Sequence, residues 1–455
     1  MRLKSNTRDT IMTEGSILGH LIRFSLPLLL GNLFQQLYNT VDSIVVGNFV
    51  SKEALAAVGS TGSIINMVVS MMSGLSIGAT VVIAQYYGAR DHKNLHDAVH
   101  TTMLATLISS TVFIGVGVAL VGPMLRFMRT PEDVFGEAST YLTIYFLGLP
   151  GLLVYNMSSG ILRAVGDSKR PLYFLCFCTA FNTLFDLLFV IVFHMGVEGV
   201  AYATILAEYL SAILTSYVLM HTHAPYQLHP RNLSINFPIL KKIIGIGFPS
   251  ALQQVLTCFS NVYVQSYVNA FGSSCMAGWS ACNKTDSFIM LPVSSLSMAI
   301  TTFVGQNTGA DKPERAREGV RTSMYLSVGV TLALTILVNI FARQILSLFT
   351  QEADVLKYGI LFVRVISPFY CVMIVYQIYA GALRGAGIVR VPVIIMLLSF
   401  VAFRQAYLFT VSRVNNIPGL MAFGYPVGWI LCSVLMTICY FRSPLGRKNK
   451  PVAAE

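Results

Sequence analysis

The chain has 455 residues, of which 55% are hydrophobic and only 11% are charged, and its mean hydropathy is +0.66. Soluble globular proteins carry about twice that share of charged residues, so the composition excludes them and indicates a polytopic membrane protein. We interpret the net charge of +11 as membrane topology rather than nucleic-acid binding. Phosphate-binding and nucleophile motifs are absent from the sequence, so neither an enzyme nor a bound cofactor is predicted.

Twelve apolar stretches are long enough to cross a bilayer, which predicts an all-α membrane protein of twelve transmembrane helices. They lie near residues 22–48, 55–83, 98–122, 137–162, 171–195, 199–220, 242–270, 275–304, 319–341, 357–383, 392–412 and 419–441. Most of the 31 lysines and arginines fall on the termini and on the loops after even-numbered spans. The positive-inside rule therefore places both termini in the cytoplasm, with the protein in the cell (inner or plasma) membrane.

The first span contains Pro27 and Asp42. Proline removes a backbone donor and kinks a helix, so Pro27 is either a hinge or a fixed bend. Asp42 follows the start of the apolar run by about 30 Å of helix, inside the membrane. Acids at this depth are costly and usually face a cavity with a partner. Asp42 is thus a candidate proton or cation site, and the alternative is a structural acid tied to a neighbouring helix.

Three further polar residues are predicted to lie at the depth of Asp42. Asn182 and Asp186 are four residues apart in the fifth span and share one helix face. Asp186 lies about 22 Å from the inner end of its span, and Thr204 lies about 8 Å into the sixth span from the outer end. Asp42, Asn182, Asp186 and Thr204 can therefore form one cluster towards the outer face.

This cluster offers two carboxylates, an amide and a hydroxyl, which suit a hard cation such as Na⁺. Two acids in a low-dielectric region also favour one bound proton, because like charge and desolvation both oppose full ionisation. The alternative is a polar contact that joins the helices. Glu208, one helical turn beyond Thr204, belongs either to the same network or to the helix packing.

The second half of the chain repeats the first. Leu162-Arg163-Ala-Val-Gly166 matches Leu383-Arg384-Gly-Ala-Gly387, and a similar register relates Pro27 to Pro249 and Gln85 to Gln306. An even number of spans in each half makes this a parallel repeat, and secondary transporters place substrate sites between such halves. We predict two pseudo-symmetric six-helix lobes at 1–220 and 242–442, a cytoplasmic linker at 221–241 and a basic tail at 443–455.

The second lobe does not copy the acids. Asp42 aligns with Val264, and Asn182 aligns with Arg404. The eighth span instead carries Lys284 and Asp286, at a depth similar to that of Arg404. Two interpretations are open: a structural charge pair of Asp286 with Arg404 or Lys284, or a substrate-lining role for these residues.

The stretch Gln36-x-Leu-Tyr38-x-x-Val-Asp42-x-x-Val-Val-Gly47, the repeat and the paired Leu-Arg-x-x-Gly motifs resemble the MATE (multidrug and toxic compound extrusion) family over residues 15–442. The resemblance implies a two-lobe antiporter that exports drugs, often lipophilic cations, in exchange for H⁺ or Na⁺. It implies that Asp42, Asn182, Asp186 and Thr204 match the cation site of the DinF-like branch. Gln36 and Tyr38 are further candidates for a substrate or charge network.

The NorM-like branch of this family has acids in helices 7 and 10, whereas residues 243–274 and 359–383 contain neither Asp nor Glu. This departure favours coupling through the first lobe. A lipid-linked precursor flippase of related architecture is the alternative function, but it needs a basic cavity, and only Lys284 and Arg404 are candidates for one. The expected partners are drug-like small molecules and the bilayer, without nucleic acid, and the expected state is a monomer.

Overall fold

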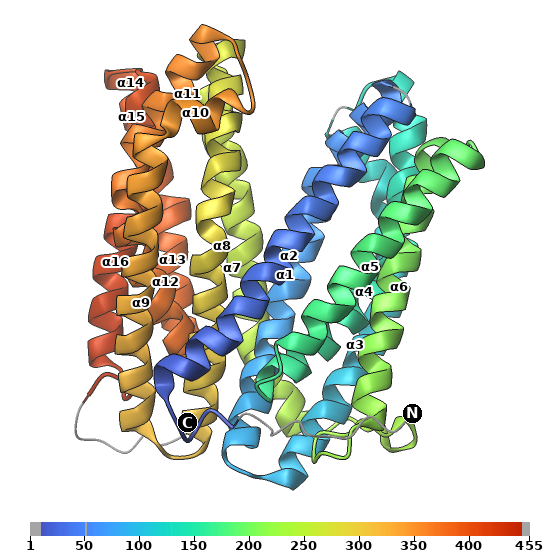
Figure 1. The fold of residues 1–455 in the computed structure, drawn as a ribbon, viewed down its shortest axis with the longest axis vertical. Helices are drawn as coiled ribbons and strands as arrows, with labels where there is room; N and C mark the ends of the chain where they lie inside the picture. Colours follow the sequence, from blue (N-terminus) through green and yellow to red (C-terminus); the bar gives the residue numbers. More distant parts are fainter. Residues whose placement is uncertain (1–10, 51, 129, 448–455) are drawn as a thin grey trace. The chain divides into compact units, whose positions relative to one another are not determined.

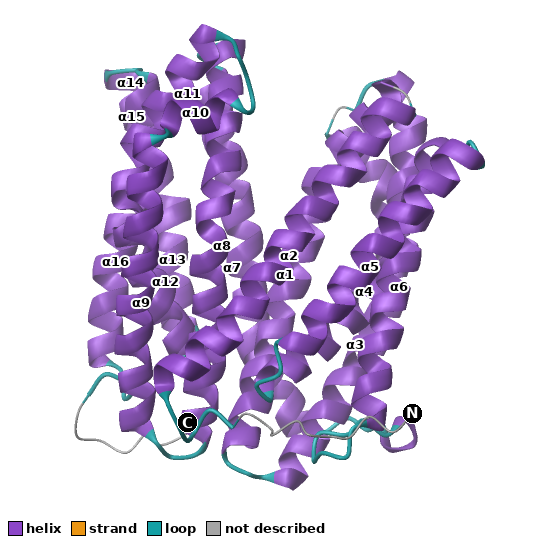
Figure 2. Ribbon diagram, viewed as in Figure 1, coloured by secondary structure: helices purple, strands orange, loops and turns teal. Residues whose placement is uncertain are grey.

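The computed structural model describes residues 11–50, 52–128 and 130–447, and the side chains of 37–49, 52–56, 60 and 63 fall outside the described residues. The described chain is helical and contains no strand (Figures 1 and 2). Its α-helices are α1 (Ile17–Phe49), α2 (Lys52–Gly88), α3 (His92–Phe127), α4 (Glu132–Ala164), α5 (Lys169–Leu187), α6 (Gly196–His221), α7 (Phe237–Asn269), α8 (Ser273–Gly309), α9 (Pro313–Ile340), α10 (Ala342–Ser347), α11 (Ala353–Ile366), α12 (Tyr370–Gly385), α13 (Arg390–Leu397), α14 (Arg404–Val414), α15 (Pro418–Ala422) and α16 (Gly424–Arg442).

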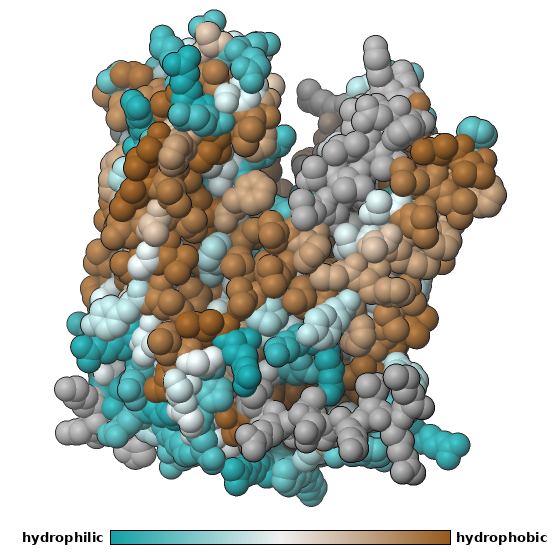
Figure 3. Space-filling view, viewed as in Figure 1, coloured by the Kyte–Doolittle hydropathy of each residue, from teal (hydrophilic) through white to brown (hydrophobic). Residues whose placement is uncertain are grey.

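Twelve helical segments of the described chain are long and apolar enough to cross a membrane, which confirms the predicted number of spans. Over the helices of the second half of the chain the surface is mainly hydrophobic, and hydrophilic residues gather at the helix ends (Figure 3). This pattern is expected where the middle of each helix faces lipid and its ends face water. The chain is therefore a multi-pass membrane protein.

The chain packs into two compact units, each with its own set of helices. The first unit comprises residues 30–247, and the second comprises residues 11–29 together with 248 onwards. The start of α1 thus belongs to the second unit, and the start of α7 belongs to the first. In the first unit α4 packs against α2, α3 and α6, and in the second α8 packs against α9, α11 and α12 (Figure 1).

The paired Leu-Arg-x-x-Gly motifs end α4 and α12 in the same way. Gly166 and Gly387 have φ of 92° and 82°, in the left-handed region that favours glycine. The N–H of the residue after each glycine donates to the carbonyl of the motif leucine, Asp167 to Leu162 at 2.9 Å and Ile388 to Leu383 at 2.8 Å. This six-to-one bond is typical of a Schellman cap, which explains why the motif needs glycine.

An interhelical contact is also repeated. Ser76 Oγ of α2 donates to the Asn156 carbonyl of α4 at 3.1 Å, and Ser297 Oγ of α8 donates to the Gln377 carbonyl of α12 at 3.0 Å. A Cβ at Gly381 would lie 2.7 Å from the Ser297 carbonyl oxygen, so the close approach of α8 and α12 requires glycine there. Small residues allow such backbone approaches in membranes.

Several spans are less regular than the apolar stretches predict. The fifth span continues from α5 into a π-helical turn at Leu188–Val192, and the eleventh has one at Leu398–Phe403. The tenth span is α11 and α12 joined by a 3₁₀ turn at Ser367–Phe369, which contains Pro368. The short helix α10 lies between spans and has no counterpart among the predicted elements.

The linker before α7 is fastened to α3 of the first unit through His100, whose side chain is fully buried. His100 Nδ1 lies 2.8 Å from the His96 carbonyl, which only accepts, so Nδ1 carries the hydrogen. His100 Nε2 therefore accepts the His229 N–H, at 3.0 Å. The neighbouring Thr101 hydroxyl accepts the Asn236 N–H at 2.9 Å.

The segment before α1 is fastened to the second unit in a comparable way. The Met12 N–H donates to Gln306 Oε1 at 2.9 Å, and Asn307 Nδ2 donates to the Met12 carbonyl at 3.3 Å. Arg315 Nη2 donates to the carbonyls of Glu14 and Gly15 at 2.9 and 2.8 Å. Each repeat is thus preceded by a segment that is tied at the ends of membrane helices.

Candidate functional site

The fifth and sixth spans bury three of the four residues of the predicted cation site. Asn182 and Asp186 of α5 are 0% exposed, and Thr204 of α6 is 5% exposed. Both helices belong to the first unit and pack against each other. The Thr204 hydroxyl donates to the Val200 carbonyl at 3.0 Å. The π-helical turn after α5 begins two residues beyond Asp186, and such turns occur frequently at functional sites.

Among the described residues, the Asn182 side chain has no hydrogen-bond partner. Both its Oδ1 and its Nδ2 are buried, and neither bonds to a described residue. Buried polar atoms are nearly always satisfied, so a buried amide without a described partner is a candidate ligand for an ion. The amide oxygen is a suitable ligand for Na⁺ and a suitable acceptor for a proton carrier.

The fourth predicted site residue, Asp42, lies within α1, but its side chain is outside the described residues, as is that of Tyr38. Gln36 of the same helix is described and is half-buried. Among the described residues, no group of three His, Cys, Asp or Glu could hold a metal ion. The predicted cation site is of a different kind. It combines Asp186 with Asp42, whose side chain is not described, and with the oxygens of Asn182 and Thr204.

Glu208 lies on the interior face of α6, one turn from Thr204. Its Oε2 is buried and makes no hydrogen bond with a described residue. A Cβ built on Gly148 of α4 would be 3.1 Å from this oxygen, so the carboxyl group lies against the α4 backbone. The sequence left its role open between the cation network and packing.

In the second unit the charge-pair interpretation is wrong. Among Lys284, Asp286 and Arg404, which are all described, no ion pair forms. Asp286 instead accepts a hydrogen bond from the hydroxyl of Tyr370, the first residue of α12. The tyrosine can satisfy the carboxyl group without a second buried charge, which avoids the desolvation cost of an ion pair.

Arg404 is 2% exposed and is held by polar groups of α7. Its Nη2 donates to Ser260 Oγ at 2.6 Å and to Asn261 Oδ1 at 2.9 Å. The guanidinium group lies 4.8 Å from the centre of the Tyr425 ring of α16, a favourable cation–π arrangement. Arg404 is therefore a link between three spans of the second unit.

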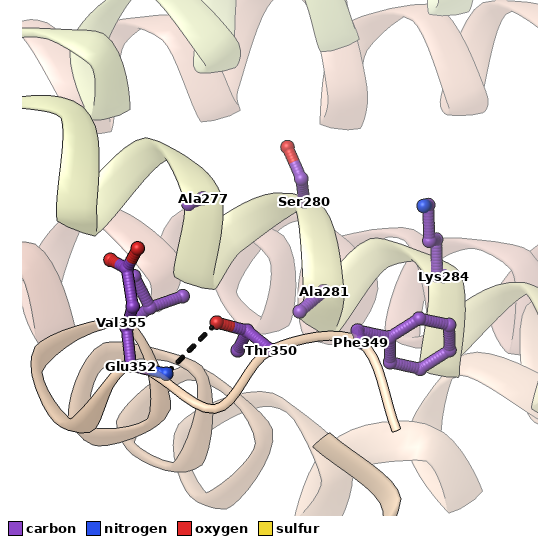
Figure 4. Close-up of a pocket in the computed structure, with 8 residues that line it drawn as sticks. All are labelled: Ala277, Ser280, Ala281, Lys284, Phe349, Thr350, Glu352 and Val355. Atoms are coloured by element: carbon purple, nitrogen blue, oxygen red, sulfur yellow. Dashed lines mark hydrogen bonds between the residues drawn. The ribbon is translucent and has the colours of Figure 1, made fainter. Parts of the chain in front are cut away.

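Lys284 is exposed and lines a pocket of about 380 Å³ beside α8 (Figure 4). Its Nζ lies 5.5 Å from the centre of the Phe349 ring, in the segment between α10 and α11. Glu352 is on the opposite side of the pocket, where its N–H donates to Thr350 Oγ1 at 3.2 Å. Lys284 thus differs from Arg404 in lacking a hydrogen-bonded partner among the described residues.

The sequence reasoning missed the residues that satisfy these charges: Tyr370, Ser260, Asn261 and Tyr425. Each lies in an apolar span, so a polar residue on a buried helix face was the available signal. The pairing itself was not readable, because Tyr370 and Asp286 are 84 residues apart.

Both halves of the sequence match a known protein family. The MatE family matches residues 27–188 and 249–405, once in each half of the chain. The chain is 31% identical over 396 residues to the "Probable multidrug resistance protein YpnP" of Bacillus subtilis (strain 168), covering 87% of this chain and 88% of YpnP. It is 28% identical over 427 residues to the "Probable multidrug resistance protein YoeA" of the same organism, covering 92% of each chain.

The fold is similar to a solved MOP superfamily transporter from Pyrococcus furiosus Vc1, with a TM-score of 0.89 at 21% identity. That similarity covers 95% of this chain and 97% of the transporter. The two family matches fall in the two halves that repeat the same helix caps and the same interhelical contact. From its sequence match and its fold, the chain belongs to the MatE family of membrane transporters.

Proposed function

We propose that this protein is a secondary active multidrug efflux antiporter. It exports organic compounds, often cationic and lipophilic, in exchange for H⁺ or Na⁺ entering the cell. Asp42, Asn182, Asp186 and Thr204 bind the coupling ion. Relatives named as multidrug resistance proteins over most of their length support the substrate class.

The observation that carries the proposal is the burial of Asn182 and Asp186 in a membrane span. Both are 0% exposed, and the Asn182 amide forms no hydrogen bond with a described residue. Polar groups are costly in a membrane and mark ion pathways more often than packing. An ion bound to the Asn182 amide oxygen would supply an interaction that the described residues do not.

Antiport requires that the ion and the drug favour different conformations of the two lobes. We propose that Pro27 acts as a hinge in this change. Pro27 lies inside α1, close to the point where the helix passes from the second unit to the first. A proline lacks one intrahelical hydrogen bond, so a helix bends there at low cost.

The seventh and tenth spans lack acids at residues 243–274 and 359–383. This favours the DinF-like branch of the family, with coupling in the first lobe. Both termini are proposed to face the cytoplasm and the protein to act as a monomer in the cell membrane, without a cofactor. The flippase alternative is less well supported, since Arg404 is 2% exposed and already bonded to Ser260 and Asn261. It therefore does not offer an open basic surface for a diphosphate.

The test is export of a fluorescent lipophilic cation from proteoliposomes under an imposed pH or sodium gradient. We expect Asp42→Asn and Asp186→Asn each to lower gradient-driven export by at least about fivefold, the lower range of typical coupling. Asp133→Asn makes the same chemical change at an exposed position in the first turn of α4 and should export normally. Normal export by both site variants would refute the coupling site, and the gradient that drives the wild type identifies the ion.

A further inference from the structure

Glu208 is a membrane-embedded acid that the proposed cation site does not use. The residues of α6 that face outward are Leu206, Tyr209 and Ile213, with exposed fractions of 42%, 37% and 63%. Glu208 is half-buried and lies on the same face as Thr204 and Ser211, which are buried. Its carboxyl group therefore points into the first unit.

Among the described residues, no cationic side chain pairs with Glu208. Tyr145 of α4 and Tyr209 of α6 interact with it electrostatically, and the Tyr209 hydroxyl is already used, donating to the Leu147 carbonyl at 2.8 Å. Tyr141 of α4 lies next to Tyr145. Cys178 of α5 packs on this face of α6, where it hydrogen-bonds with Ser211. The ion pairs formed among described residues do not include Glu208.

Two features distinguish Glu208 from a packing residue. Its Oε2 is buried without a hydrogen bond to a described residue, although a structural acid would be expected to have one. This oxygen also packs against the α4 backbone, where a Cβ built on Gly148 would meet the Ile205 side chain first and this oxygen at 3.1 Å. A carboxyl group in these surroundings is costly as an anion and is stable when it carries a proton.

Glu208 lies about 6 Å further along α6 than Thr204, towards the end expected in the cytoplasm. Ser211 and Thr215 continue the same buried face of α6 in that direction. Hydroxyls and waters along such a face can pass a proton from one carboxyl group to the next. The described neighbours of Glu208 lack a second carboxylate, so the position suits a proton better than Na⁺, which needs several oxygen ligands.

We propose that Glu208 is a second proton-carrying carboxyl group, which takes the coupling proton from the Asp186–Thr204 site on its way to the cytoplasm. In the step, Glu208 first releases its proton inward and becomes a carboxylate. Asp186 then gives its proton to Glu208, so that Asp186 becomes a carboxylate and Glu208 a carboxylic acid again. The inference rests on the proposed antiport function and deepens it by naming the proton as the ion.

The first measurement is infrared spectroscopy of the purified full-length protein, which detects the C=O stretch of protonated carboxyl groups. Glu208→Gln keeps the shape of the protonated acid, and we expect it to remove one such band. Glu198→Gln removes an exposed acid from the first turn of the same helix and should leave the band intact. This readout does not require transport, so it stands even if the antiport proposal fails.

The second measurement is pH-gradient-driven export from proteoliposomes at several internal pH values. We expect Glu208→Gln to lower export at least about fivefold and to flatten its dependence on internal pH. Glu208→Asp, which keeps a carboxyl group, should restore part of both. An unchanged infrared spectrum, or normal export with an unchanged pH profile in Glu208→Gln, would overturn the relay. Normal export by Asp186→Asn would instead refute the coupling site itself.

Discussion

The two units share a repeated plan of helices and differ in what they bury. The first unit buries oxygen-bearing groups, of which the Asn182 amide is unbonded to any described residue. At the aligned position the second unit buries the Arg404 guanidinium, whose Nη2 is bonded to Ser260 and Asn261 while its Nε has no partner among the described residues. A polar group with its partners in place strengthens the fold, whereas one without them is available for a ligand. The difference supports the proposal that the coupling ion binds in the first unit.

The attached segments show the opposite, a similarity between the units. Residues 12–15 are tied to Gln306 and Arg315, and the linker is tied to His100 and Thr101. The bonded residues differ in type, but each segment precedes the first helix of its repeat. The architecture thus repeats more faithfully than the chemistry does.

The largest effect is expected from Arg404→Ala. The change removes the shorter of two hydrogen bonds to Asn261 Oδ1, removes the cation–π contact with Tyr425 and opens a cavity. We expect a loss of about 3 kcal/mol in the free energy of unfolding, measured by titrating mixed micelles with SDS. Arg413→Ala removes an exposed arginine of the same helix and should cost less than about 1 kcal/mol. Equal losses in both variants would contradict the structural role of Arg404.

Asn182→Leu should separate function from stability. Replacing an unbonded buried amide by an apolar group of similar size is expected to leave the free energy of unfolding unchanged or slightly higher. Export should nevertheless fall by about tenfold, since an ion ligand is lost. The matched variant is Asn339→Leu in the second unit, where Nδ2 donates to the Thr335 carbonyl at 2.8 Å and to Ser367 Oγ at 2.7 Å. That variant should lose stability, and a comparable loss in Asn182→Leu would remove the distinction between the units.

The sequence predicted the spans well because a membrane requires about 20 consecutive apolar residues for each helix. It also predicted that Asn182, Asp186 and Thr204 would lie at a similar depth, and all three are buried, as is usual for polar groups in a membrane. It could not predict which groups meet. The Met12 contact with Gln306 joins residues 294 positions apart, and the turns that interrupt the fifth and tenth spans depend on packing with neighbouring helices.

His100→Leu tests the attachment of the linker. The leucine cannot accept the His229 N–H, so we expect a local loss of about 1 kcal/mol. The linker should then open more often, and trypsin should cleave after the exposed Arg231 several times faster. His223→Leu changes an exposed histidine of the same linker and provides the control. An unchanged cleavage rate in His100→Leu would mean that the bonds to Thr101 and Asp97 hold the segment without His100.

The smallest effect is expected from Lys284→Met, because the two cations of the second unit differ in their surroundings. Lys284 is exposed at the pocket beside α8, and its contact with Phe349 is a single cation–π interaction at 5.5 Å. Such a contact at an exposed site contributes about 0.5–1 kcal/mol, so unfolding should shift by no more than that. Lys357→Met, at an exposed position of α11, gives the baseline for removing a charge.

If Lys284→Met instead lowers export of the lipophilic cation without changing stability, the pocket takes part in transport and the second unit is more than a scaffold. Because methionine retains the length of the lysine side chain, this comparison isolates the charge from the packing.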